Sequence, residues 1–189
     1  MSRNKLATTV SALALAVSGW TVTAVGTAHA GAYDSINMQK QEQSQWCWDA
    51  SGNTIASWWG YNYSQTDFCN LANRATGVSC ANQPATPNDI AGAWRQMGFA
   101  NTGTLQYSAA SFDQTHTEVD ASRPFLARIG WKSGGGHFNV IYGYDETNNT
   151  IAVADPWPAT QTYTWWNYND YVSNSSFNWT HTQIGVSAT

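Results

Sequence analysis

The apolar residues of this chain recur at helical spacing in its first half and alternate with polar residues in much of its second half. Four apolar side chains after residue 46 lie near one helical face: Trp48, Ile55, Ala56 and Trp59. They predict a helix that begins near Cys47 and ends at Gly60. Residues 31–45 are polar without a clear period, and we expect residues 61–86 to form a loop.

A second helix is indicated by the residues at both of its ends. Thr86 can cap it, Pro87 suits its first position, and Asp89 supplies an acid three residues after the cap. The helix should run to Met97, where Gly98 stops it.

From residue 124 onward the pattern changes to short β-rich runs. We expect strands over residues 124–131, 137–145 and 151–154, with a turn at Asn148 and Asn149. The last third alternates aromatic residues with Thr and Asn, which indicates more sheet, or a short helical turn at 169–173. A weaker helical pattern covers residues 111–121. Helices followed by an antiparallel sheet predict an α+β domain.

Composition and charge narrow the class of protein. The 189 residues allow one ordinary domain. Aromatic residues make up 14% of the chain, whereas a disordered chain is depleted in them, so we expect a packed core. From residue 31 onward there are six basic and twelve acidic residues, and this net charge of −6 disfavours a nucleic-acid partner.

The first thirty residues show the three-part pattern of a secretory signal peptide. Two cations among the first five residues precede an apolar stretch over residues 6–17, and Ala28 and Ala30 suit a cleavage site. The apolar run is shorter than the ~20 residues of a membrane anchor, which is the alternative. We therefore expect a signal peptide at 1–30 and a secreted, extracellular domain at 31–189, with no membrane partner.

The odd number of cysteines is informative in an exported protein. Cys69 and Cys80 bracket a polar loop and are the natural disulfide pair, which would contribute about 3 kcal/mol. Cys47 is then the free thiol, and it stands at a predicted helix N-terminus, where unpaired amides stabilise a thiolate. The alternative for Cys47 is a buried structural thiol.

A nucleophilic thiolate requires a basic partner, which in turn requires an orienting group. His137 follows three glycines and opens a predicted strand, and Asp155 follows the next strand, so antiparallel pairing could bring them together. A loop histidine and a strand-end turn are the alternatives. Three histidines after residue 30, without HExxH or CxxC motifs, indicate no metal site.

Three blocks of sequence resemble bacterial papain-like cysteine peptidases. They are QEQSQWCW at 41–48, GHF at 136–138 and DPW at 155–157, in the order of the family. The nearest branch is the avirulence-effector type, followed by the bacteriocin-transporter peptidase type. The resemblance implies an α+β, papain-like fold, in which an N-terminal helical subdomain packs on a C-terminal antiparallel sheet with a cleft between them. It also implies a cysteine endopeptidase that needs no cofactor.

The resemblance carries five roles onto this sequence. The nucleophile falls on Cys47, the base on His137 and the orienting residue on Asp155. The oxyanion-hole residue falls on Gln41, and the residue that shields the site from water falls on Trp157. Three neighbouring glutamines compete for the oxyanion-hole role: Gln39, Gln43 and Gln45.

One residue departs from the family pattern. Small residues usually follow Trp-Cys-Trp, and Asp49 stands there in this chain. An acid in the first turn suits the helix dipole, but a negative charge directed into the cleft would oppose ionisation of the thiol.

The sequence by itself leaves two other functions open. One is a different thiol acyl-transfer enzyme on the same scaffold, such as a cell-wall amidase or a transglutaminase-like protein. The other is a catalytically silent module whose aromatic residues bind glycans. We expect a monomer that acts on a protein or peptide substrate, with a proteinaceous inhibitor as a candidate regulator.

Overall fold

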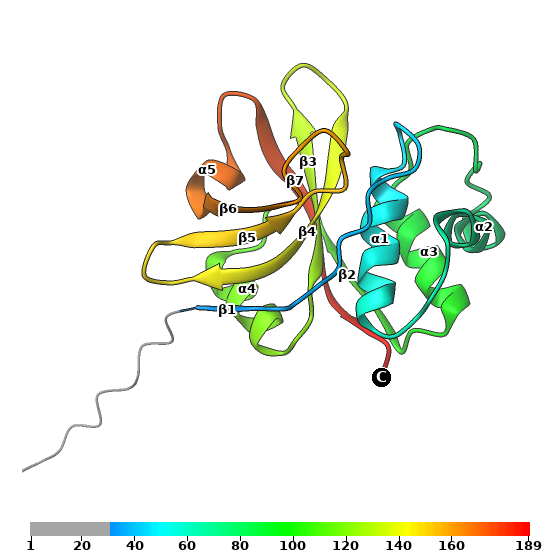
Figure 1. Ribbon diagram of the computed structural model, residues 1–189, viewed down its shortest axis with the longest axis horizontal. Coiled ribbons are helices and arrows are strands. Elements are labelled where there is room, and N and C mark those ends of the chain that lie inside the picture. The colour runs from blue at the N-terminus through cyan, green and yellow to red at the C-terminus, as the bar shows by residue number, and fades with distance from the viewer. Residues whose placement is uncertain (1–30) are drawn as a thin grey trace, which may run out of the picture.

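Three helices form one layer of the molecule and pack beside an antiparallel sheet (Figure 1). The computed structural model describes residues 31–189, so the predicted signal peptide lies outside the described residues. The helices of this layer are α1 (Cys47–Trp58), α2 (Gln65–Thr76) and α3 (Pro87–Met97). The expected α+β fold, with helices first and the sheet afterwards, is confirmed.

The two predicted helices of this layer form for the expected reasons. Helix α1 begins at Cys47 and ends at Trp58, two residues before the expected end. At the start of α3 the Asp89 carboxylate accepts a hydrogen bond from the backbone N–H of Thr86, 2.7 Å away. Gly98 ends α3 with a φ of 88°, a left-handed conformation that favours glycine.

Helix α2 corrects the expectation of a loop over residues 61–86. Ser64 caps the helix by accepting a hydrogen bond from the N–H of Asp67, and Gly77 ends it with a φ of 82°. Its buried face packs on the rest of the layer through Phe68 and Leu71. The capping signals are present in the sequence, but polar residues around a short apolar face obscured the helical period.

The sheet has seven strands, all antiparallel, in the order β2-β7-β3-β4-β5-β6, with β1 paired to β4. The strands are β1 (Ala32–Tyr33), β2 (Asn101–Gln106), β3 (Phe125–Trp131), β4 (Gly136–Asp145), β5 (Thr150–Ala154), β6 (Tyr163–Asn167) and β7 (Phe177–Ser187). The three predicted strands correspond to β3, β4 and β5. Strand β2 was not expected, and it pairs only with the C-terminal strand β7.

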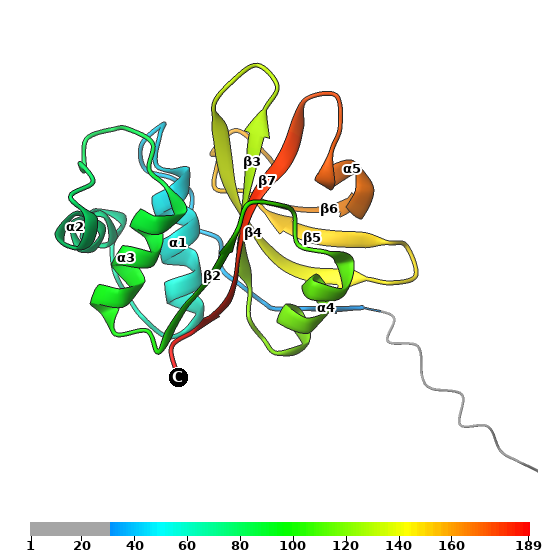
Figure 2. The same ribbon diagram turned by 180° about the vertical axis from the view of Figure 1, so that it is seen from behind.

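Two shorter helices, α4 (Phe112–Asp120) and α5 (Tyr168–Val172), lie on the side of the sheet away from α1, α2 and α3 (Figures 1 and 2). Helix α4 confirms the weaker helical pattern, and α5 is the short helical turn that was the alternative to sheet.

Two apolar cores result, one on each face of the sheet. Phe138 and Val140 of β4 join the core beneath α1, whereas Ile141 joins the core on the far side. The start of β4 therefore lies beside α1, and this contact brings His137 of β4 close to Cys47 of α1.

The predicted disulfide is confirmed: Cys69 of α2 is bonded to Cys80, which leaves Cys47 as the free thiol. Within residues 31–189, none of the helices is long and apolar enough to cross a membrane.

Candidate active site

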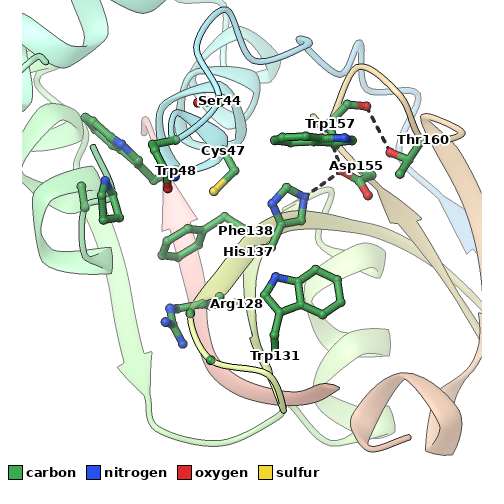
Figure 3. Close-up of a pocket in the computed structure, with 16 residues that line it drawn as sticks. Ser44, Cys47, Trp48, Arg128, Trp131, His137, Phe138, Asp155, Trp157 and Thr160 are labelled. Carbon is green, nitrogen blue, oxygen red and sulfur yellow. Dashed lines mark hydrogen bonds and ion pairs between the residues drawn. The ribbon is translucent and has the colours of Figure 1, made fainter. Parts of the chain in front are cut away.

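Cys47 is the first residue of α1, and its side chain lies next to His137 at the wall of a cavity (Figure 3). The preceding residue, Trp46, is the N-cap and contributes no side-chain hydrogen bond to the helix. The N–H groups of the first turn are therefore not capped by a side chain, and such groups favour a negative charge at the helix N-terminus.

The two tryptophans beside Cys47 hold this turn in place. Both are buried, and each indole N–H donates to a backbone carbonyl 3.2 Å away: Trp46 to Ala81 and Trp48 to Gln83. The segment that follows the disulfide therefore supports the position of the thiol.

His137 lies at the start of β4, and Asp155 comes directly after β5. Because β4 and β5 are antiparallel neighbours, the two side chains meet, with Nε2 of His137 2.8 Å from Oδ1 of Asp155. The backbone N–H of Trp157 donates to the same carboxylate oxygen at 2.7 Å. The other ring nitrogen of His137 faces Cys47 (Figure 3).

These contacts determine the protonation of the pair. Burial alone would lower the pKa of His137, but hydrogen bonds and charges from Asp155 and Cys47 outweigh it and raise the pKa to about 9. Burial would raise the pKa of Asp155, but the hydrogen bond and charge of His137, together with further hydrogen bonds, lower it. At neutral pH the site therefore holds an imidazolium next to a carboxylate.

Two tryptophans flank the imidazole. The ring of Trp157 meets that of His137 edge-on, with centroids 6.5 Å apart, on the side of Asp155. The ring of Trp131 lies roughly parallel to the imidazole at 6.4 Å and is itself braced by Phe177. Sequence reasoning missed Trp131, and its position at the end of a predicted strand, before the glycine run, is the signal that could have identified it.

Lys40 is a second residue that sequence reasoning missed. Its ammonium group donates to three backbone carbonyls of the loop after β5, those of Asp155 at 3.2 Å, Trp157 at 2.7 Å and Thr160 at 3.3 Å. The backbone N–H of Gln41 adds a bond to the carbonyl of Pro156. The polar N-terminal segment thereby holds the loop that carries the carboxylate.

The structure places Gln41 beside the site, with its amide already engaged. Its Nε2 donates to the carbonyls of Gln43 at 2.8 Å and Ser44 at 2.9 Å, so both N–H bonds are used within its own loop. The side chain is buried and lines a smaller cavity with Trp157, not the cavity of Cys47.

Asp49 does not enter the site. Its side chain is 0% exposed and does not line the cavity of Cys47. Burial, reinforced by the charge of Glu42, raises the pKa of Asp49 to about 9. The carboxyl group is therefore neutral at pH 7, and no negative charge two residues away opposes ionisation of the thiol.

The cavity itself has a volume of about 660 Å³ and lies between the helical layer and the sheet. Pro84 and Ala85, just before α3, line it together with Trp48 of α1, whereas His137 and Phe138 of β4 line it from the sheet. Figure 3 shows Trp48, His137 and Phe138 around the cavity. Among the described residues no cluster of three or more His, Cys, Asp or Glu side chains could hold a metal ion.

A thiol at a helix N-terminus that faces a strand-borne histidine, across a cavity between helices and an antiparallel sheet, defines the class of papain-like cysteine peptidases. A sequence model described as "Papain-like cysteine protease AvrRpt2" matches residues 29–174, and the chain belongs to this family. The resemblance drawn from the three sequence blocks is thereby confirmed. None of the curated protein sequences matches the chain.

Solved structures show the same fold. The chain is similar to the peptidase domain of Streptococcus ComA, a bi-functional ABC transporter, with 19% identity and a TM-score of 0.60 over 80% of this chain and 97% of that one. It is also similar to the peptidase domain of Streptococcus mutans ComA, with 18% identity and a TM-score of 0.52 over 78% of this chain and 98% of that one.

Proposed function

We propose that this cysteine peptidase is a secreted endopeptidase that cleaves peptide bonds through Cys47, His137 and Asp155. The observation that carries the proposal is the placement of one imidazole between a free thiol and a carboxylate, at the wall of a cavity large enough for a peptide. A nucleophile, a base and an orienting group in this order are the requirements of thiol acyl transfer.

The reaction would proceed in two halves. The Cys47 thiolate attacks the carbonyl carbon of the peptide bond, and His137 gives its proton to the leaving nitrogen, which departs as a new amino terminus. Water, deprotonated by His137, then attacks the thioester, which releases the acid and restores the thiol. Asp155 keeps the imidazole oriented and stabilises its positive charge.

The oxyanion of each tetrahedral intermediate forms near the start of α1. The backbone N–H of Cys47 is one candidate donor to it. The side-chain amide of Gln41 is the second, and it must release one of its two bonds within the loop to reach the oxyanion.

The test begins with the thiol. Iodoacetamide should modify Cys47 stoichiometrically and with a pH-dependent rate, and His137→Ala should greatly slow this labelling. His116→Gln is the matched control, because His116 contacts Glu146 and Tyr144 and does not line the cavity. Unchanged labelling in His137→Ala would contradict the assigned pair.

Product analysis shows which acyl donor the enzyme uses and whether water or an amine accepts the acyl group. Cys47→Ala should abolish the release of new amino termini from casein without unfolding the domain. Cleavage of muropeptides, or incorporation of an amine into casein, would instead favour the amidase or transglutaminase-like alternatives, which use the same chemistry at Cys47.

We also propose that the protein is exported and cleaved after Ala30. The disulfide between Cys69 and Cys80 supports this location, because disulfides persist in oxidising compartments. Amino-terminal sequencing of protein from the culture medium should begin at Gly31, and retention of the full chain inside the cell would contradict export.

A further inference from the structure

Arg128 lines the same cavity as Cys47 and His137, and the proposed reaction gives it no role (Figure 3). It lies on β3, opposite Phe138 of the neighbouring strand. Its Nη1 donates to the hydroxyl of Thr180 on β7, 3.0 Å away. The guanidinium is therefore held by a neutral group, the hydroxyl of Thr180.

No carboxylate within residues 31–189 forms an ion pair with Arg128. The contrast with Arg123 is clear, because that side chain makes two 3.0 Å bonds to Glu118. The only carboxylate that lines the cavity is Asp155, which already binds His137. Although acids outnumber bases in the domain, this half-buried arginine has no counter-ion of its own.

The glycine run 134–136, which leads into β4, leaves room for the guanidinium in the cavity. A Cβ atom on Gly136 would lie 2.5 Å from Nη2 and 2.6 Å from Cζ of Arg128, so any side chain there would displace the arginine. Gly134 and Gly135 have φ values of 100° and 82°, and a Cβ on either would meet nothing within 4 Å. This rim of the cavity therefore has no side chains that cover the charge.

The position of Arg128 indicates which half of a substrate it meets. His137 must give its proton to the leaving nitrogen, so the leaving half passes on the side of His137, Asp155 and Trp157. Arg128 lies on the other side, toward Phe138 and Trp48 (Figure 3). These two aromatic side chains, with Pro84 and Ala85 opposite, form apolar walls around one positive group.

We propose that Arg128 is a specificity-determining residue that binds the carboxylate of a glutamate or aspartate side chain in the acyl half of the substrate. This inference rests on the proposed peptidase function. A guanidinium presents a planar fork that matches a carboxylate, and the apolar walls fit the methylene groups of such a side chain. An uncharged side chain at this place leaves the half-buried charge of Arg128 unpaired.

The first experiment compares cleavage sites. Casein is digested with the enzyme, and mass spectrometry scores how often Asp or Glu occurs at each of the positions before the new amino termini. We expect one of those positions to be enriched in acidic residues, and we expect Arg128→Gln to remove the enrichment. Arg95→Gln is the matched control, since Arg95 lies on α3 and does not line the cavity.

The second experiment uses pairs of blocked peptides that differ only by Glu or Gln at the position found. The wild-type enzyme should favour the Glu peptide in kcat/KM by about 10-fold or more, as for sites that lose a buried polar partner. Arg128→Gln should lower kcat/KM for the Glu peptide by at least about 10-fold more than for the Gln peptide. Arg128→Glu should shift the preference to the matching Lys peptide.

Binding separates this inference from the proposed function. If no peptide is cleaved, the affinities of the same Glu and Gln peptides for Cys47→Ala protein still decide the role of Arg128, whereas the peptidase proposal alone fails. With no cleavage site to choose the position, acetylated and amidated casein-derived peptides with Glu or Gln at each position in turn serve as probes. Equal turnover or affinity for Glu and Gln at every position would overturn the inference. So would an equal loss for both peptides in Arg128→Gln, because a purely structural role predicts that result.

Discussion

The hydroxyl of Ser51 donates a buried hydrogen bond of 3.1 Å to the backbone carbonyl of Phe138. Ser51 lies one turn after Cys47 on α1, and Phe138 follows His137 on β4. This bond joins α1 to β4 one turn from Cys47 and one residue from His137, so it helps to hold the two elements that carry the proposed nucleophile and base.

Ser51→Ala should therefore impair both stability and activity. Loss of the bond leaves a buried carbonyl unsatisfied and should lower the free energy of unfolding by about 1–3 kcal/mol. The small shift between α1 and β4 should reduce kcat/KM by about 10-fold or more, because catalysis is sensitive to misplacement of reacting groups. Thermal unfolding and steady-state kinetics measure the two effects.

Thr182→Val is the matched control for this change. The Thr182 side chain is buried, and its hydroxyl donates a part-buried bond of 2.8 Å to the carbonyl of Ser108, away from the cavity. It should lose a similar amount of stability with little loss of kcat/KM. Equal losses of activity in the two variants would show that the Ser51 bond has no special influence on the site.

Asp155→Asn should change the pH profile as well as the rate. The hydrogen bond and charge of Asp155 help to raise the pKa of His137 to about 9, so their removal lowers that pKa. Because the protonated imidazole is the acid of the proposed reaction, activity should be lost as pH rises through this pKa. The alkaline limb of kcat/KM should therefore move to lower pH, with weak residual activity. An unmoved alkaline limb would contradict the assignment of Asp155.

Lys40→Met should loosen the loop that carries Asp155. The variant loses three hydrogen bonds from the ammonium group to backbone carbonyls of this loop. We expect kcat/KM to fall by about 10-fold, because the imidazole loses a firmly held partner. Lys132→Met is the control, since Lys132 is exposed and does not line the cavity. Equal kinetics in the two variants would show that Lys40 does not position the carboxylate.

Asp49→Asn should stabilise the protein increasingly as pH rises. In the unfolded chain the carboxyl group ionises near its ordinary pKa of 3.8, whereas burial keeps it protonated in the folded protein up to about pH 9. As pH rises from about 4 to about 9, the free energy of unfolding of the wild type therefore falls by up to about 1.4 kcal/mol per pH unit. The variant has no carboxyl group at this position and lacks this pH-dependent loss. Urea unfolding of both proteins at pH 4 and pH 7.5 measures it. A constant difference between them would show that Asp49 is ionised in the folded state.

Much of the site follows from local signals in the sequence. The capped helix at Thr86, the strands on either side of the glycine run, and the pairing of Cys69 with Cys80 all depend on residues close together in the chain. The proximity of His137 and Asp155 follows in the same way, because consecutive antiparallel strands bring their ends together.

Other features required the tertiary structure, because the partners are distant in sequence. Strand β2 carries no alternating apolar pattern, and its place depends on β7, the last strand of the chain. Lys40 reaches a loop more than a hundred residues away. The protonation of Asp49 depends on complete burial, which no local pattern reveals. The sequence alone determined which residues could perform the chemistry. Only the tertiary structure decided that Asp49 is neutral and that Arg128 lines the cavity of Cys47 without an ion-paired carboxylate among residues 31–189, because both depend on contacts between distant parts of the chain. The Gln41 amide is bound by carbonyls of its own loop, a local geometry that no sequence pattern reveals.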